Sequence, residues 1–516
     1  MNQTIKRPLA LIILDGWGFT YETRGNAIAA AHTPYYDAIR NEFPFTILEA
    51  SGRAVGLNDS IPGNAEIGHI NMGAGRVVKT DAVRIRESIT DGSFFSNRVL
   101  TGALSSARAN DQKVHFVGLV SDGDVHSSSD TLYSLLRAAR NIGVKEVYVH
   151  AILDGRDVPQ RTADVYLEAL EVKMADIGLG RIASICGRHF GMDHSEHWER
   201  TARAFTMMVH AEGERASDPV SAVRSSFLRG ITDEFIAPIV IEREPGVPVA
   251  TIGNGDLVVF FNHRADTMRQ LVRSIAVPEL GESSSLIKPR IDAVCITEYD
   301  PDFRLKTMFP PLPREGDLGS VFSKADIHNY RISEPDRFAH VTMFFNGRRD
   351  GENPVEMHIQ VPRSERMFDR ESEPEMRSFK ITDALTRVAK TDPQAVFIAN
   401  FPAPGLLAET GNIDRTVEAV QYIDTCLGGI VDRMRQLGGV TLITSTHGNC
   451  ESMLTIDGDV DRFATANPVP FHLIDHSNRS TKLRDGGTLS DVAPTVLGII
   501  GIEAPSSMTG NDLRIM

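Results

Sequence analysis

The sequence predicts an α/β protein built on parallel sheets. Short apolar runs recur along the chain and end abruptly in polar or glycine-rich residues, which is typical of strands buried on both faces. Stretches with helical spacing separate many of these runs, and this strand–helix alternation indicates an α/β chain. The predicted strands cover residues 9–14, 114–120, 147–153, 182–186, 257–261, 293–296, 340–345, 395–399 and 440–444.

Three segments carry a helical pattern. Residues 131–141 follow a predicted strand, and residues 413–436 have apolar side chains at three- and four-residue intervals. Residues 490–500 predict an apolar C-terminal helix that begins at Ser490 or Asp491. Two further segments predict irregular structure: a surface loop at residues 281–285 and a proline- and charge-rich linker at residues 310–316.

Polar residues cluster where the predicted strands end. In open α/β sheets, ligands bind at the carboxyl ends of the strands. We therefore expect the chemistry on one edge of each sheet. The residues concerned are Asp15, Asp122, Asp154-Gly-Arg-Asp157, Arg188, Asn262-His-Arg264, Asn400 and Thr446-His-Gly-Asn449.

Length and charge limit the classes of function. A chain of 516 residues suggests two or three domains, or one domain with a large insertion. Lys and Arg number 54 and Asp and Glu number 68, so the net charge is −14. This argues against a nucleic-acid or anionic-membrane surface. An anionic substrate would need a local cluster of arginines.

The compartment is predicted from what the sequence lacks. Its four cysteines form no CxxC and no regular spacing, which fits a reducing cytosol. The first apolar run, residues 9–14, is too short for a signal peptide, and no run approaches the roughly 18 residues that span a bilayer. We expect a cytoplasmic protein without a membrane partner.

A series of motifs resembles one family, the cofactor-independent (2,3-bisphosphoglycerate-independent) phosphoglycerate mutases. The motifs run in order over nearly the whole chain. In the N-terminal half they are Leu11-Ile-Ile-Leu-Asp-Gly-Trp-Gly18, Gly63-Asn-Ala-Glu-Ile-Gly-His69, Ser121-Asp-Gly-Asp-Val-His126, Leu153-Asp-Gly-Arg-Asp157 and Trp198-Glu-Arg200. In the C-terminal half they are His340-Val-Thr342, His447-Gly-Asn449, Asn467-Pro-Val-Pro470 and Asp491-Val-Ala-Pro494.

The resemblance implies a fold and an activity. The fold would be α/β: an alkaline-phosphatase-like domain, formed by residues 1–79 and 313–516, with a second α/β domain of residues 80–312 inserted into it. Members of the family use two manganese ions and a serine nucleophile, which takes the phosphoryl group from one glycerate hydroxyl and returns it to the other. The inserted domain holds the glycerate. We expect a monomer.

The nucleophile of the family is missing. The family's serine lies in Gly-Asn-Ser-Glu-Val-Gly-His, and its position here is Ala65. A methyl group cannot accept a phosphoryl group, because covalent catalysis needs an activated oxygen, sulfur or nitrogen. The resemblance also places the catalytic lysine at Arg337, which keeps the charge but cannot transfer a proton at neutral pH.

Most of the implied metal ligands are also missing. Asp15, His447 and Glu409 remain at ligand positions, whereas Thr446, Gly405 and Ala464 stand where the family has acidic or histidine ligands. Divalent ions that activate phosphates need several carboxylate or imidazole ligands. We therefore expect manganese to bind weakly or not at all. Glu451, Asp457, Asp459 and Asp461 lie nearby in sequence and could partly compensate, although a solvated acidic loop explains the three aspartates more simply.

The substrate positions of the inserted domain are better preserved. The resemblance assigns substrate binding to His126, Arg156, Asp157, Arg188 and Arg264, together with Arg337. Three arginines of that domain would form a clamp for a small phosphoglycerate-like anion. Two further family arginines are replaced, by His194 and Thr267.

Three hypotheses follow. The first is a degenerate family member that keeps affinity for phosphoglycerate-like anions and acts in sensing, regulation or partnership with another protein. The second is an enzyme that transfers a phosphoryl or phosphonyl group directly between two substrates, with Thr446, Glu409, His126 and Arg337 as the groups to test. The third is a working mutase whose nucleophile has moved to Thr446 or Ser60, which we rank lowest because covalent chemistry tolerates little misplacement.

Overall fold

Each of the two units of the chain is built around one largely parallel β-sheet. The computed structural model describes residues 7–59, 61–277, 288–311, 316–347, 354–363 and 370–515. Unit 1 is formed by Met1–Lys79 and Pro313–Met516, and unit 2 by Thr80–Leu312. The predicted loop at residues 281–285 and most of the predicted linker, residues 312–315, lie outside the described residues.

The sheet of unit 1 has eight strands in the order β13-β12-β14-β1-β15-β16-β2-β18. Its centre, from β13 to β15, is parallel, and β16 runs antiparallel to both of its neighbours. The strands are β1 (Leu9–Leu14), β2 (Phe45–Glu49), β12 (Asn329–Ser333), β13 (Glu356–Gln360), β14 (Val396–Phe401), β15 (Val440–Thr444), β16 (Val469–Ile474) and β18 (Gly487–Thr488).

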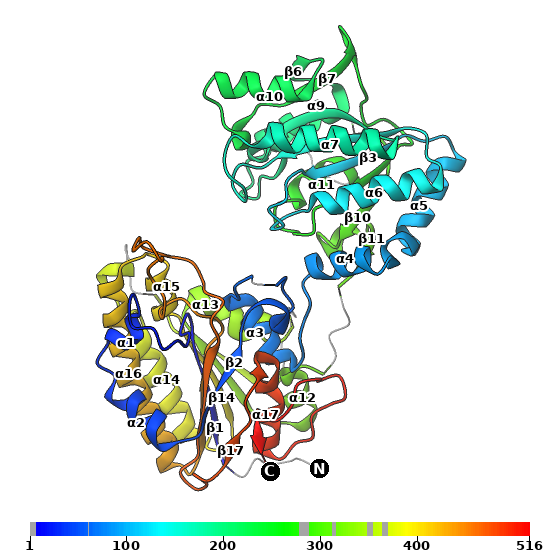
Figure 1. Cartoon of the computed structure of the whole chain (residues 1–516). Coiled ribbons are helices and arrows are strands. Elements are labelled where there is room, and N and C mark those ends of the chain that lie inside the picture. The colour runs from blue at the N-terminus through cyan, green and yellow to red at the C-terminus, as the bar shows by residue number, and fades with distance from the viewer. Residues whose placement is uncertain are drawn as a thin grey trace. The chain divides into compact units, whose positions relative to one another are not determined.

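Helices cover both faces of this sheet, so the central strands are buried on each side (Figure 1). One face packs against α3 (Ala65–Ala74), α12 (Leu318–Ala325) and α17 (Val492–Ile500). The other packs against α2 (Pro34–Glu42), α14 (Ser378–Thr391) and α16 (Ile413–Gln436). Shorter elements are α1 (Ala27–Ala30), α13 (Pro335–Ala339), α15 (Ala403–Ala408), β17 (Lys482–Leu483) and β19 (Arg514–Ile515).

The sheet of unit 2 follows the order β11-β10-β9-β3-β4-β5-β7-β6, with β8 paired to β7. It is parallel from β11 to β5, and β7 runs antiparallel to β5. The strands are β3 (Val114–Leu119), β4 (Val147–Leu153), β5 (Arg181–Gly187), β6 (Glu214–Ala216), β7 (Ile239–Glu244), β8 (Val247–Pro248), β9 (Leu257–Phe260), β10 (Asp292–Thr297) and β11 (Lys306–Phe309).

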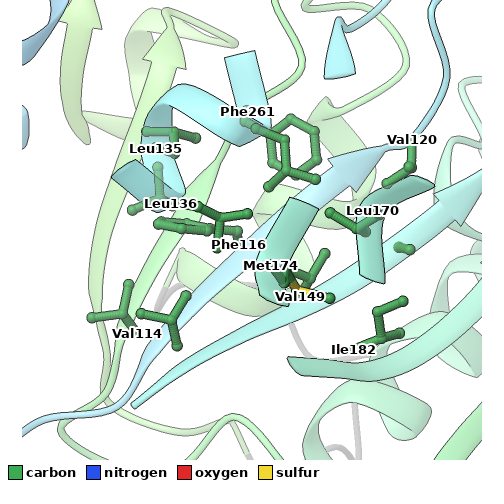
Figure 2. Close-up of a cluster of buried hydrophobic side chains, with 14 of the residues drawn as sticks. Val114, Phe116, Val120, Leu135, Leu136, Val149, Leu170, Met174, Ile182 and Phe261 are labelled. Carbon is green, nitrogen blue, oxygen red and sulfur yellow. The ribbon is translucent and has the colours of Figure 1, made fainter. Parts of the chain in front are cut away.

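Unit 2 also has a helical layer on each face of its sheet. Figure 2 shows one core, in which Leu135 and Leu136 of a helix lie near Phe116 of the sheet, and Leu170 and Met174 of another near Val149. That face carries α4 (Asp81–Thr90), α5 (Arg98–Ala109), α6 (Ser129–Ile142), α7 (Ala163–Ile177) and α10 (Pro219–Leu228). The opposite face carries α8 (Arg188–Gly191), α9 (Trp198–His210) and α11 (Arg269–Ala276).

Eight of the nine predicted strands are present within two residues of their predicted ends. The helix predicted at residues 413–436 is α16 with the same bounds, and the helix predicted at 131–141 is the core of α6. At the C-terminus a short turn, Leu489–Asp491, precedes α17. Among the described helices, none is long and apolar enough to cross a membrane.

The prediction of a strand at residues 340–345 is wrong, because this segment is helical. The chain leaves the sheet after β12, Pro335 begins α13, and His340–Phe344 continues as a turn of π-helix. Short apolar runs do not distinguish strands from buried helical segments. One of the strands that the prediction missed is β12, whose apolar pattern is broken by Arg331. That side chain is completely buried and pairs with Glu356 of β13 at 3.1 Å.

A chain of hydrogen bonds crosses three neighbouring strands of unit 2. Nε2 of His115 lies 3.3 Å from Oδ2 of Asp256, and its Nδ1 lies 3.0 Å from Nε2 of His150. Nδ1 of His150 lies 2.7 Å from Oγ of Ser184. With Asp256 ionised, the serine donates to His150, His150 to His115 and His115 to the carboxylate, so both imidazoles are satisfied in their neutral forms.

These hydrogen bonds between neutral histidines predict that unit 2 loses stability in acid. Burial lowers the pKa of His115 and lowers that of His150 well below its usual value. The unfolded imidazoles bind protons below about pH 6.5 and the folded ones do not, so stability falls as the pH falls through that value, by up to about 2.7 kcal/mol per pH unit for two histidines. Urea unfolding between pH 8 and pH 5 measures the slope.

The variant His150→Gln should reduce that slope by up to about 1.4 kcal/mol per pH unit, because one of the buried neutral histidines is removed. His210→Gln, which removes an exposed histidine of the same unit, should leave it unchanged. An unchanged slope in His150→Gln would contradict the assignment.

Candidate functional site

Asp15 lies at the carboxyl end of β1 in unit 1 and is completely buried. Its Oδ2 accepts a hydrogen bond from Nε of Arg337 at 2.5 Å. Its Oδ1 accepts from Nδ2 of Asn400 at 2.9 Å and from Oγ1 of Thr446 at 3.1 Å. The donors come from the ends of strands β14 and β15 and from α13, which follows β12. Both oxygens of the carboxylate are therefore bonded, as a buried charge requires.

Protonation states follow from these bonds. Burial raises the pKa of Asp15, but the Arg337 guanidinium and three nearby histidines outweigh it and hold this pKa well below its usual range. An ionised carboxylate only accepts, so Thr446 must donate its one hydroxyl proton to Asp15. In the 2.7 Å contact between Oγ1 of Thr446 and Nδ1 of His447, the imidazole is therefore the donor.

Ala65 is the first residue of α3, which begins at the N-cap Asn64 and borders the same centre. The Ala65 side chain is a buried methyl group. Its carbonyl oxygen lies 2.7 Å from Nδ1 of His69, and Nε2 of His69 lies 3.3 Å from Nδ2 of Asn400. Burial lowers the pKa of His69 to about 4, so its neutral ring donates to Ala65 and accepts from Asn400. Two hydrogen bonds thus connect the backbone of Ala65, through His69, to Asn400, which itself donates to Asp15.

Arg337 also pairs with Glu409. The two predicted metal ligands Asp15 and Glu409 therefore contact the same guanidinium. The distance from NH2 of Arg337 to Oε1 of Glu409 is 3.5 Å. Glu409 directly follows α15 and is 46% exposed. Its other oxygen lies 3.8 Å from NH1 of Arg370. The structure therefore brings Asp15, Arg337, Glu409 and His447 together, with a guanidinium between the carboxylates.

The residues present do not fit the two-manganese centre that the resemblance implies. Asp15 already accepts hydrogen bonds from three protein donors, one of them a cation. Gly405, at a family ligand position, leaves little room for a side chain, since a Cβ there would make a tight contact of 3.1 Å with the Cβ of Asp15. A Cβ at Gly16 would approach the Cα of Gly405 to 2.6 Å, so the two backbones are in contact. Among the described residues, no three His, Cys, Asp or Glu side chains converge on one point.

The nearby acidic residues do not complete the set. Glu451 is buried and its carboxylate accepts from the backbone amides of Gly18 and Asn449 and from Nδ2 of Asn467. It therefore holds together the loops that contain Gly18, Asn449 and Asn467. Asp457 and Asp459 are exposed and Asp461 is partly exposed, as the prediction of an acidic loop requires.

Unit 2 has a second polar centre, at the carboxyl ends of β3, β4 and β5. Arg188 is buried, and its NH1 lies 2.8 Å from Oδ1 of Asp154 and 3.0 Å from Oδ2 of Asp157. Asp154 also accepts from Oγ of Ser121 at 2.6 Å and from the amides of residues 156 and 157. A guanidinium fixed between two carboxylates is the core of this centre.

His126 extends this centre. Its Nε2 lies 3.8 Å from Oδ2 of Asp157, and its Nδ1 lies 3.1 Å from Oγ1 of Thr267. Burial, Arg188 and Arg264 lower the pKa of His126 to about 3, so its ring is neutral. Burial and Asp154 raise the pKa of Asp157 despite the two arginines. Thr267, a replacement for a family arginine, thus holds the ring of His126.

Two of the predicted clamp arginines lie outside this network. Arg264 is half exposed and forms a bidentate pair with Asp266 at 2.8–3.1 Å. Arg156 is 65% exposed and lies 3.7 Å from Glu234. Both side chains can therefore turn toward a ligand without breaking the buried core.

Sequence reasoning missed several residues of these centres. His69 lies within a quoted motif but was not assigned a role, and Asn400 was recognised only as a polar residue at a strand end. Arg370 carried no signal, because an isolated arginine in a charged segment looks like any surface residue. Ser121, which opens the motif that ends at His126, could have been found from its place directly after a predicted strand.

Comparisons with known proteins bear on the family of this chain. A family model described as the BPG-independent PGAM N-terminus matches residues 85–301. The chain is 43% identical over 519 residues to a 2,3-bisphosphoglycerate-independent phosphoglycerate mutase of Moorella thermoacetica, covering all of both chains. It is 42% identical over 508 residues to the protein of the same name from Desulforudis audaxviator, covering 98% of this chain and 99% of that one.

A solved structure is similar over the full length. The phosphoglycerate mutase of Leishmania mexicana, crystallised at low cobalt concentration, has a TM-score of 0.73 at 27% identity and covers all of both chains. The predicted architecture is confirmed: the protein is α/β, and a second α/β unit, Thr80–Leu312, is inserted into the first.

Removing Arg337 tests how Asp15 is stabilised. We expect Arg337→Ala to lower the free energy of unfolding by about 3–5 kcal/mol at pH 7, because it leaves a buried carboxylate without its cation. The loss should shrink toward pH 5, where Asp15 can bind a proton instead. Urea unfolding of both forms measures it.

Arg435→Ala provides the control, because it breaks an exposed pair with Asp432 on α16 and should cost about 1 kcal/mol or less. Equal losses in the two variants would show that Arg337 is an ordinary surface residue.

Proposed function

Because the chain belongs to the 2,3-bisphosphoglycerate-independent phosphoglycerate mutase family, we propose that it is a phosphoglycerate-binding member without mutase turnover through a phosphoserine. The observation that carries this proposal is Ala65. A buried methyl group stands at the start of α3, in a residue that three successive hydrogen bonds connect to Asp15 through His69 and Asn400, where the resemblance requires a nucleophilic hydroxyl. No phosphoenzyme can form on it.

The proposal includes weak or absent manganese binding. Asp15 already accepts from Arg337, Asn400 and Thr446, and a metal ion would have to displace a guanidinium from it. The backbone contact between residues 15–16 and Gly405 opposes a further ligand from α15. His447 and Glu409 remain, and two such groups do not form a tight site for a hard divalent ion.

The ligand that we propose is a small phosphoglycerate-like anion. In unit 2, Arg188, Asp157 and His126 would form the floor of the clamp, and Arg264 and Arg156 would close on the anionic groups from its edge. The remaining predicted substrate residue, Arg337, belongs to unit 1, where it is bonded to Asp15. Because the net charge is −14, we expect no nucleic-acid partner. We also propose that the protein is a cytoplasmic monomer that acts in sensing or in partnership with another protein.

The contacts of Thr446 weigh against the hypothesis of a relocated nucleophile. Its hydroxyl donates to Asp15 and accepts from His447, so His447 is not placed to remove its proton and only Asp15 could act as the base. Asp15, with its depressed pKa, is a weak base. Ser60, the other candidate, lies outside the described residues.

One contact favours direct group transfer as the second candidate function. Arg337 is fixed by Asp15 and keeps its NH2 toward solvent-exposed Glu409, where a guanidinium could stabilise charge on a group passing between two substrates. This function needs no phosphoenzyme, and it would take His126 and Glu409 as the groups to vary.

Mutase activity tests the proposal directly. We expect no interconversion of 3- and 2-phosphoglycerate by the pure protein, with manganese or with chelator, in an expression host free of its own mutases. We expect none from Ala65→Ser either, because the metal centre is also missing. Manganese-dependent turnover by the unmodified protein would contradict the proposal.

Ligand binding tests the proposed clamp. We expect 3-phosphoglycerate to raise the melting temperature of the full chain, with a stabilisation of about 2.7 kcal/mol at a hundredfold excess over Kd. Arg264→Gln should weaken this effect. Arg224→Gln is the matched control, because Arg224 is equally exposed and pairs with Asp164 on the same unit. No shift in the unmodified chain would exclude the clamp.

A further inference from the structure

We propose that unit 1 contains a metal-free oxyanion site between Arg337 and Arg370, which the carboxylate of Glu409 fills when no ligand is bound. The ligand class is a phosphate, phosphonate or carboxylate group. The inference rests on the proposed function in one respect, the replacement of the metal ions at Asp15 by a guanidinium. It goes beyond it by adding a binding site that uses a residue, Arg370, to which the resemblance gives no role.

The site is part of a chain of alternating charges that leads from the interior to the surface. In order, the chain runs through Asp15, Arg337, Glu409, Arg370, Asp336 and Arg363. The exposed fraction of the side chain is 0% at Asp15, 15% at Arg337, 46% at Glu409 and 38% at Arg370, so Glu409 and Arg370 lie nearer to the solvent than the first pair, while Asp336 behind Arg370 is 7% exposed. Ligands of open α/β sheets bind at this edge, beyond the carboxyl ends of the strands.

Glu409 forms the two longest ion pairs of this series of charges. Its oxygens lie 3.5 Å from Arg337 and 3.8 Å from Arg370, which is longer than a charged hydrogen bond of about 2.7–2.9 Å. Its side chain is 46% exposed. The neighbouring pairs are shorter, at 2.5 Å for Arg337 with Asp15 and 3.2 Å for Arg370 with Asp336. An incoming anion would therefore displace Glu409 rather than break the other pairs.

The two arginines are held in position by other carboxylates. Arg337 bonds Asp15 through Nε, which leaves its terminal NH2 toward Glu409. Arg370 bonds Asp336 through NH2 and has NH1 toward Glu409. Asp336 is held in turn by both Nε and NH2 of Arg363. Preorganised guanidinium donors suit a doubly charged oxyanion better than the single charge of a carboxylate.

The backbone supports the same placement. Glu409 directly follows α15, and Arg370 begins the turn Arg370–Ser372, which contacts α15. The two labels α15 and α13 lie on the same edge of unit 1 in Figure 1, and Arg337 belongs to α13. Three separate segments thus contribute one side chain each to the site.

The test is the binding of inorganic phosphate to the full chain in EDTA, measured by isothermal titration calorimetry. We expect the unmodified chain to bind phosphate without metal. Glu409→Gln should bind it roughly three- to tenfold more tightly, because the competing carboxylate is gone, and Arg370→Gln should weaken binding by a similar factor or more.

Glu418→Gln is the matched control. Its carboxylate also pairs with an arginine, Arg415 at 2.8 Å, and its side chain is 41% exposed. It changes the net charge by the same amount and should leave phosphate affinity unchanged. An equal gain in Glu418→Gln would reduce the effect to overall charge and overturn the proposal.

Further outcomes separate this site from the proposed function. Absence of phosphate binding in EDTA, weaker binding by Glu409→Gln, or complete loss of binding in Arg264→Gln of unit 2 would each overturn the site. Failure of the unit 2 clamp, or tight binding of manganese, would overturn the proposed function. The change in phosphate affinity of Glu409→Gln in EDTA tests the site in unit 1 whether or not the unit 2 clamp binds its ligand.

Discussion

The ion pair between Asp15 and Arg337 is the interaction on which the centre of unit 1 depends. A carboxylate with no exposure is stable only beside a cation or several donors, and here it has both. The resemblance implies that metal ions would supply the positive charge. In this chain the cation is covalently part of the protein, and Asn400 and Thr446 complete the bonds to the carboxylate.

The replacement of metal ions by a guanidinium that we propose would change what the centre can do. An ion such as manganese or zinc lowers the pKa of bound water or of a hydroxyl, and a guanidinium does not. Arginine also cannot give up a proton at neutral pH. What remains is a fixed positive charge with directional donors, which binds and orients an oxyanion. The chemistry of unit 1 therefore favours binding over phosphoryl transfer through the protein.

Unit 2 uses the same physical solution with a different outcome. Arg188 is buried between Asp154 and Asp157, and its charge holds two carboxylates in place. Around this core Arg264 and Arg156 are exposed and paired with Asp266 and Glu234. A buried, hydrogen-bonded floor with exposed cations at its edge is an arrangement that can capture a small anion.

The sequence by itself determined the family, the α/β fold, all but one of the predicted strands and the presence of Ala65, because these depend on local patterns of a few consecutive residues. It could not reveal β12, since Arg331 interrupts the apolar run, or the helical state of residues 340–344. Only the tertiary structure decided which charges meet. Arg337 and Asp15 are 322 residues apart in the chain, and an ion pair leaves no local pattern at either end. The same reason hid Arg370, whose role depends on its distance from Glu409.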